Sequence, residues 1–149
     1  MSLTRRPATE ADFELVFRLR TDAYAGYAVR HFGEWDDASE REYLQSQWDQ
    51  RTRAILVLNG RDIGCLDFIV GPQRAWLGNI ILEPAMRNRG LGRAVLEQWL
   101  RWVDHHGREA GLNVYRDNPA VRLYERLGFA IVGEDPPYVL MVRPARAGA

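Results

Sequence analysis

The stretch EPAMRNRGLGRAVLEQWL, residues 83–100, decides how the rest of the chain is interpreted. It follows an apolar segment typical of a strand and continues into residues at helical spacing, with Gly90 and Gly92 at the junction. Glycine inside either element would weaken it, whereas glycine at the junction lets another group approach the backbone closely. A helix start with bare backbone N–H groups and nearby arginines favours an anion such as a pyrophosphate.

Two common phosphate-binding motifs do not fit this stretch. A Walker loop has Lys and Ser or Thr after its second glycine, where this chain has Arg93 and Ala94. The dinucleotide fingerprint needs a third small residue where Val95 stands, and it opens its fold instead of following several strands. Taken alone, the glycine pair is equally compatible with an ordinary strand-to-helix turn.

Composition predicts one globular domain over residues 1–149. The chain is 46% hydrophobic, without linkers, repeats or low-complexity tracts, which is enough for one buried core. Its 20 basic and 20 acidic side chains balance, so no global charge attracts nucleic acid or a membrane surface. A single cysteine, Cys65, excludes an internal disulfide, and no apolar run approaches the roughly 20 residues of a membrane span. We expect a cytoplasmic protein with no nucleic-acid or membrane partner.

The first part of the chain predicts a strand, two helices and a hairpin. The first helix has Thr9 and Asp12 in the positions of a capping box. A loop over residues 23–37 is expected to join it to a second helix with a capping box of Ser39 and Glu42. Two strands around an Asn-Gly pair then predict a hairpin, and a third antiparallel strand precedes the glycine stretch.

The second part of the chain predicts two helices and three strands. The helix that starts at the glycine stretch is expected to end at Gly107 and to be followed by a short strand. A shorter helix with Asn118 as its N-cap and Gly128 just past its end comes next. Two strands separated by Pro136-Pro137 complete an α/β pattern with a mixed sheet.

Two motifs at this separation resemble the GNAT superfamily of N-acetyltransferases. The first is Arg87-x-x-Gly90-x-Gly92 after NIILEP, and the second is NVYRDNPAVRLYERLGF, which contains Asn118, Ala120, Tyr124, Gly128 and Phe129. The resemblance implies a single-domain α/β (α+β) fold with a mixed, mostly antiparallel sheet of six to seven strands and about four helices. It also implies acetyl-CoA as cofactor, its pyrophosphate held by backbone amides of the loop and its pantetheine lying along the preceding strand. The implied cofactor-binding residues are Ile80, Ile81, Leu82, Arg87, Asn88, Arg89, Gly90, Leu91, Gly92, Arg93, Asn118, Ala120 and Tyr124.

Acetyl transfer to an amine needs a neutral amine and a proton for the departing thiolate. Tyr124, a phenol that normally ionises near pH 10, is the expected proton donor. Many family members carry a Glu on the strand before the loop, but here that strand has Asn79 and no carboxylate. Glu34 and Asp67 remain candidates for the general base, and a water chain without a single essential base is an equal alternative.

The acceptor site is expected near the connection between the first two helices, which is rich in aromatic residues. Aromatic faces and nearby carboxylates would attract an ammonium group. The expected substrate-binding residues are Tyr27, His31, Trp35, Asn79 and Tyr138.

The resemblance implies direct acetyl transfer, in a ternary complex, to a primary amine of a small molecule or peptide. A protein N-terminus or lysine side chain is an alternative acceptor. A non-catalytic acyl-CoA sensor and a nucleotide-binding or structural α/β domain are alternative functions. No metal site is expected, since the adjacent His105 and His106 point in different directions and lack further ligands. Such folds commonly form homodimers.

Overall fold

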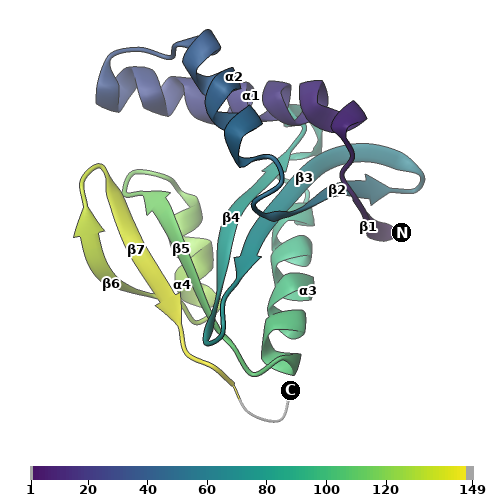
Figure 1. Cartoon of the computed structure of the whole chain (residues 1–149). Coiled ribbons are helices and arrows are strands. Elements are labelled where there is room, and N and C mark those ends of the chain that lie inside the picture. Colours follow the sequence, from purple (N-terminus) through teal and green to yellow (C-terminus); the bar gives the residue numbers. More distant parts are fainter. Residues whose placement is uncertain (1, 147–149) are drawn as a thin grey trace. The chain divides into compact units, whose positions relative to one another are not determined.

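The computed structural model describes residues 2–146, which form seven strands, four α-helices and two short 3-10 helices. The strands are β1 Leu3–Pro7, β2 Thr52–Leu58, β3 Arg61–Val70, β4 Arg74–Leu82, β5 Glu109–Tyr115, β6 Ala130–Asp135 and β7 Tyr138–Arg143. The helices are α1 Phe13–Phe32, α2 Asp37–Gln47, α3 Leu91–His105 and α4 Ala120–Arg126, with η1 Glu10–Asp12 and η2 Pro84–Met86. Figure 1 shows these elements in the ribbon.

The strands form one sheet in the order β1-β2-β3-β4-β5-β7-β6. β4 and β5 pair in parallel from Arg74↔Glu109 to Leu77↔Leu112, whereas β1–β2, β5–β7 and β6–β7 are antiparallel pairs. The expected mixed, mostly antiparallel α/β sheet is therefore confirmed. Within the described part of the chain, no helix combines the length and the apolar character that a bilayer-spanning segment needs.

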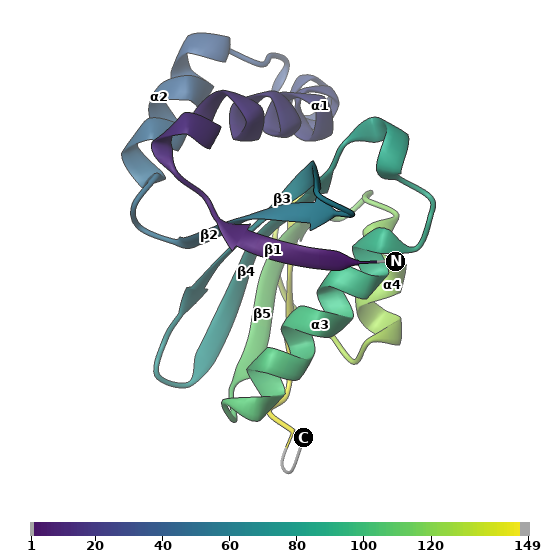
Figure 2. The same cartoon turned by 90° about the vertical axis from the view of Figure 1, so that its right-hand side faces the viewer.

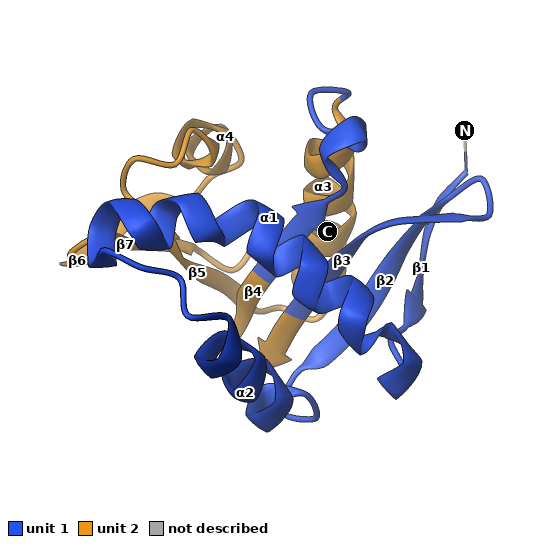
Figure 3. Ribbon diagram, turned by 90° about the horizontal axis from the view of Figure 1, so that it is seen from above, with its two compact units in different colours: residues 1–67, 79–89 blue, residues 68–78, 90–149 orange. Residues whose placement is uncertain are grey.

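The chain divides into two compact units that alternate along the sequence (Figure 3). Unit 1 consists of residues 1–67 and 79–89, and it contains β1, α1, α2, β2, most of β3 and the end of β4. Unit 2 consists of residues 68–78 and 90–149, and it contains the start of β4 and every element from α3 onward.

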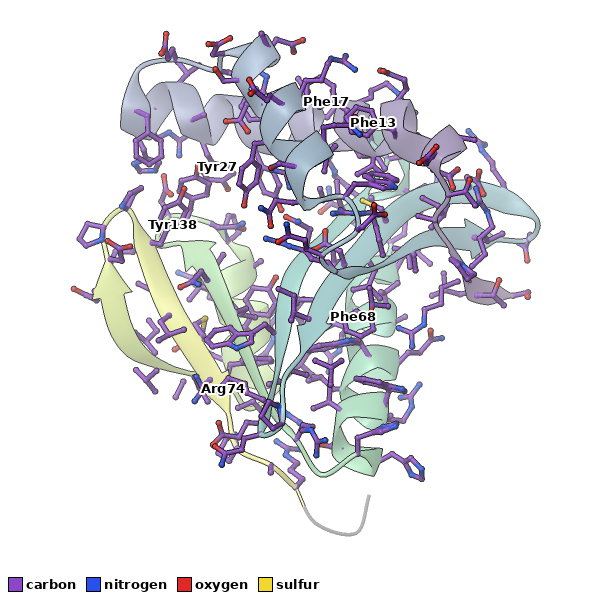
Figure 4. All side chains as sticks on the ribbon, in the orientation of Figure 1. Phe13, Phe17, Tyr27, Phe68, Arg74 and Tyr138 are labelled. Carbon is purple, nitrogen blue, oxygen red and sulfur yellow. The ribbon has the colours of Figure 1, made fainter. Side chains whose placement is uncertain are left out.

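The core of unit 1 lies under its two helices. Phe13 and Phe17 lie where α1 and α2 meet (Figure 4), and the ring of Phe13 is 5.3 Å from that of Trp48. The backbone N–H of Thr9 donates to Asp12 Oδ2 at 2.8 Å, so the expected cap at the start of the first helical segment is confirmed. The buried α1 residues Val16, Phe17 and Leu19 share one hydrophobic cluster with the strand residues Ile55, Cys65 and Ile81.

α1 is longer than the sequence pattern predicts. Residues 23–32, expected to belong to a loop, continue the helix to Phe32, and only residues 33–36 connect it to α2. Several alanines in this stretch favour helix. Gly33 ends the helix in a left-handed conformation with φ 88°, and its N–H donates to the carbonyl of Val29 at 3.0 Å.

The N-terminal cap of α2 also differs from the prediction. Asp36 accepts hydrogen bonds from the backbone N–H groups of Ala38 and Ser39, and the Ser39 hydroxyl donates to its other carboxylate oxygen at 2.8 Å. The predicted Ser39–Glu42 capping box is therefore wrong, because Asp36 supplies a stronger cap three residues earlier.

The hairpin between β2 and β3 is confirmed. Asn59 and Gly60 adopt positive φ angles of 50° and 83°, as the tight turn that matches strand twist requires. β3 carries the chain's single cysteine, Cys65, into the core of unit 1, where it is 1% exposed.

Cys65 is expected to be unreactive in the native protein. Burial raises the pKa of its thiol to about 12, and only the thiolate reacts with disulfide reagents. An aromatic disulfide reagent at about pH 8 should release no chromophore from the folded protein and one equivalent after denaturation. Rapid reaction of the folded protein would contradict the burial of this strand.

Unit 2 packs α3 against its strands. Phe68 lies 5.8 Å from the ring of Trp99 and 5.3 Å from that of Trp102 (Figure 4). Both α3 and α4 cover the same face of the unit 2 strands (Figure 2). α3 ends just before Gly107, which has φ 66°, as the sequence predicts.

Candidate functional site

The start of α3 presents backbone donors that no side chain caps. Gly90 precedes the helix in a left-handed conformation with φ 76°, and its carbonyl accepts the N–H of Ala94 at 3.1 Å. The N–H groups of Leu91, Gly92 and Arg93 have no acceptor within the helix, as at every helix start. These donors, together with the positive end of the helix dipole, suit a pyrophosphate.

The arginines around this loop are less available than the sequence suggests. Arg87 Nε donates to the carbonyl of Leu82 at 3.1 Å and ties the loop to the end of β4. Arg93 Nε pairs with Glu97 Oε1 at 2.8 Å, one turn along α3. Arg89 is exposed and has no ion-pair partner among residues 2–146. The backbone N–H groups of the loop are therefore more available to an anionic ligand than the guanidinium groups of Arg87 and Arg93 are.

Tyr124 is held on α4 with its hydroxyl unpaired. α4 begins at Ala120 with Pro119 as its N-cap residue, so the predicted N-cap, Asn118, lies one residue too early, although its side chain accepts the N–H of Ala120 at 2.9 Å. The Tyr124 ring packs edge-on against Phe129 at 5.7 Å. Burial raises the pKa of Tyr124 to about 12, so the phenol is protonated at neutral pH. Within the described residues its hydroxyl has no hydrogen-bond partner, and it can therefore donate to a ligand.

A buried chain of polar groups links α1 to three strands of unit 1. The Tyr24 hydroxyl donates to Asn79 Oδ1, and Asn79 Nδ2 donates to Asp67 Oδ2 at 2.8 Å. The Asp67 carboxylate also forms ion pairs with Arg51 Nη1, 3.0 Å from Oδ1, and with Arg53 Nη1, 3.2 Å from Oδ2. Because the Asn79 oxygen accepts and its nitrogen donates, the network fixes the orientation of this amide.

Tyr24, Arg51 and Arg53 belong to this network but are not among the site residues expected from the sequence. A signal was present, because Arg53, Asp67 and Asn79 are each polar residues within apolar strand segments. Burial lowers the pKa of the Arg53 guanidinium, and the charge of Asp67 opposes that shift. A buried charge of this kind needs a partner on a neighbouring strand.

Comparison with known proteins identifies the fold and the chemistry. The acetyltransferase (GNAT) family matches residues 15–129. The chain belongs to this family. The [ribosomal protein bS18]-alanine N-acetyltransferase of Escherichia coli K12 is 31% identical over 111 residues, which are 73% of this chain and 75% of that protein.

Solved GNAT structures share the fold over nearly the whole chain. The acetyltransferase of Thermus thermophilus superposes with a TM-score of 0.76 at 26% identity and 97% coverage of both chains. The E. coli ribosomal-protein-S18-alanine N-acetyltransferase gives 0.74 at 24% identity, over 99% of this chain and 97% of that one. PaiA from Thermoplasma acidophilum, in complex with coenzyme A, gives 0.75 at 16% identity, over 97% and 99%. As a member of the acetyltransferase (GNAT) family, this protein is an N-acetyltransferase that uses acetyl-CoA.

In unit 1 of this GNAT enzyme, two of the expected substrate-binding residues lie on α1. Tyr27 and His31 are one turn apart, and Arg30 lies over the Tyr27 ring at 5.5 Å. Trp35 lies in the connection to α2, where its indole Nε1 is buried without a hydrogen-bond partner among the described residues. Glu34 beside it is exposed.

In unit 2, the expected substrate residue Tyr138 begins β7. Its ring lies 4.7 Å from that of Tyr115 on the neighbouring strand, and the two hydroxyls are 3.4 Å apart. No group of three His, Cys, Asp or Glu side chains within residues 2–146 is arranged to hold a metal ion. His105 and His106 are exposed at the end of α3.

The end of β4 is held from two sides. The N–H of Glu83 donates to the carbonyl of Ile63 at 2.8 Å, and Arg18 pairs with the Glu83 carboxylate at 2.7 and 3.0 Å. The Arg18 pair lowers the pKa of Glu83, so this carboxylate is ionised at neutral pH. Ile81 and Leu82 keep their side chains buried, which leaves the backbone as the part of this strand end suited to a ligand.

Asp67→Asn should destabilise the protein strongly. The substitution leaves the Arg53 side chain, 5% exposed, without its counter-ion, and we expect unfolding to require about 3–5 kcal/mol less free energy. Denaturant unfolding followed by circular dichroism measures the loss. Asp62→Asn is the control, because its pair with Arg6 has about 40% exposure on both sides and should contribute about 0–1 kcal/mol. Equal effects of the two substitutions would contradict the importance of the buried network.

Proposed function

We propose that this enzyme transfers the acetyl group of acetyl-CoA directly to a primary amine of a peptide or small molecule, with Tyr124 as the proton donor. The observation that carries the proposal is the Tyr124 hydroxyl on α4, which is protonated and has no hydrogen-bond partner within residues 2–146. A departing thiolate needs one proton or hydrogen bond, and this phenol can supply it. We further propose that residues 1–149 act as one catalytic domain.

The cofactor contacts in this proposal follow the donors that the chain leaves open. The N–H groups of Leu91, Gly92 and Arg93 hold the pyrophosphate, with Arg89 and Asn88 beside them. The backbone of residues 80–82 holds the pantetheine, and Asn118 and Ala120 present the start of α4. Bound acetyl-CoA supplies the acetyl thioester, and the chain supplies its position and the proton.

We propose that Asp67 positions Asn79 and is not itself the base. Its two oxygens already bind two guanidinium groups and one amide, and protonation would disrupt both ion pairs. Glu34 is exposed on a short connection, where a base has little to fix it. A water held near Asn79 is then the route for the amine proton.

The lack of a dedicated base favours an acceptor of low pKa. At pH 7 a lysine-like amine of pKa about 10.4 costs roughly 4–5 kcal/mol to deprotonate, whereas a peptide α-amine of pKa about 8 costs only about 1 kcal/mol. The 31% identical relative acts on an alanine of ribosomal protein bS18, and an alanine within a protein has a free amine only at the N-terminus. We therefore favour a peptide α-amine as the acceptor and the cytoplasm as the place of action.

Three acceptors test this proposal. One peptide has a free N-terminal alanine and no lysine, the second has a blocked N-terminus and one internal lysine, and the third acceptor is a polyamine. Mass spectrometry detects the acetylated product, and a thiol reagent detects free CoA. The chain has 20 arginines and no lysine, so self-acetylation of a lysine cannot confuse the product analysis.

The expected result is turnover of the first peptide, with sequential kinetics in which both substrates must bind before product leaves. Preference for the lysine peptide or the polyamine would overturn the α-amine assignment while leaving amine acetylation intact. Acetyl-CoA binding without turnover on any acceptor would contradict the proposed enzyme activity.

A further inference from the structure

A cavity of about 280 Å³, open to solvent, lies at the surface of unit 2 beside the second half of α3. Its wall comes from α3, the end of α4, the end of β7 and the segment that follows β7. The charged residues that line it are Glu97, Arg101, Asp104, Arg126, Arg143 and Arg146. None of these belongs to the glycine loop or to the proposed acceptor residues.

The two carboxylates of this cavity are already neutralised. Arg143 binds Asp104 through both nitrogens of its fork, at 2.7 and 3.0 Å, and the two side chains are only 4% and 9% exposed. Glu97 pairs with Arg93, which does not line the cavity. Each acid therefore has its own arginine, and neither opposes an incoming anion with a free charge.

Three guanidinium groups in the cavity wall remain without a counter-ion. Arg101, Arg126 and Arg146 have no carboxylate within ion-pair distance among residues 2–146. They come from three different elements, which are α3, the last turn of α4 and the segment after β7. Three like charges around one small cavity repel one another, and a multivalent anion would relieve that repulsion.

Two of the cavity arginines also lie over backbone groups at the end of α4. Arg143 Nε donates to the carbonyl of Leu127 at 3.0 Å, which covers an acceptor at the negative end of α4. The Arg146 guanidinium lies against Gly128, at the place that a Cβ of this residue would occupy. Arg143 thus covers a carbonyl oxygen that would otherwise repel a bound anion.

We propose that this cavity binds the phosphate group of a small molecule. Guanidinium forks match phosphate oxygens, and donors from three elements suit a tetrahedral anion better than the two coplanar oxygens of one carboxylate. The volume lies just below the roughly 300–1,000 Å³ typical of drug-sized ligands, so the ligand is compact. The same chemistry could come from a free phosphate compound or from the 3′-phosphate of the cofactor, and we assign the cavity to the first.

The test uses inorganic phosphate as the probe and the full chain saturated with coenzyme A. The bound coenzyme A occupies the glycine loop, and its 3′-phosphate occupies its own site, so added phosphate reports only on a further site. Calorimetry should show one phosphate site. Arg126→Gln and Arg101→Gln, at exposed helix positions, should each weaken phosphate binding about 10- to 100-fold. The control, Arg61→Gln, removes an exposed charge from unit 1 and should leave the affinity for phosphate unchanged.

Three results would overturn the proposal. In the first, phosphate fails to bind the coenzyme A complex at millimolar concentration. In the second, Arg61→Gln weakens phosphate binding as much as the cavity variants do. In the third, Arg126→Gln weakens acetyl-CoA more than acetyl-dephospho-CoA, which would give the cavity to the 3′-phosphate of the cofactor. These measurements are independent of turnover, so their failure is distinct from failure of the proposed function.

Discussion

Gly92→Glu is expected to abolish acetyl-CoA binding, with a rise in Kd of at least about 100-fold. Gly92 lies in the first turn of α3, among backbone N–H groups that have no acceptor in the helix. A carboxylate there would occupy these donors and repel a pyrophosphate. Two unit charges about 5 Å apart repel by about 3 kcal/mol at an effective dielectric constant near 20. Calorimetric titration with acetyl-CoA measures the change.

Two further substitutions at the same position separate charge from bulk. Gly92→Ala keeps the helix start and adds only a methyl group, so it should bind almost as the parent does. Gly92→Gln adds the shape of glutamate without its charge and should fall between the two. If Gly92→Glu bound acetyl-CoA as tightly as the parent, with an unchanged melting temperature, the assignment of this loop to the pyrophosphate would be wrong.

The sequence predicted those parts of the fold that depend on neighbouring residues. The Asn59-Gly60 turn and the helix start after Gly90 are each determined by a few adjacent residues. The α2 cap was missed for a local reason as well, since Asp36 and Ser39 are both good caps and only the chain path decides between them.

Contacts between distant segments were not predictable in the same way. The bond from Tyr24 to Asn79 spans 55 residues, and that from Asn79 to Asp67 joins neighbouring strands. Patterning shows that a polar residue interrupts an apolar strand, but the partner depends on register, which a single sequence does not specify. The pair of Arg143 with Asp104, which spans 39 residues, likewise depends on tertiary packing.

Tyr124→Phe is expected to lower kcat about 10- to 1000-fold while leaving the Kd of acetyl-CoA nearly unchanged. Phenylalanine keeps the ring and its edge-on contact with Phe129, and it removes only the hydroxyl. That hydroxyl has no partner among the described residues, so its loss leaves no buried group unsatisfied. Steady-state rates with saturating acetyl-CoA, together with calorimetry, separate turnover from binding. Tyr43→Phe, at a residue 47% exposed on α2, is the control.

The pH dependence of Tyr124→Phe distinguishes a proton donor from a packing residue. Burial raises the pKa of Tyr124 to about 12, so the phenol stays protonated from about pH 7 to 10, and the rate ratio of parent to variant should be constant there. The ratio should fall only as the pH approaches 12, where the parent loses its donor. A variant as fast as the parent would remove Tyr124 from the mechanism. A ratio that fell with a midpoint near pH 10 would mean that the phenol ionises as in water, which contradicts its burial.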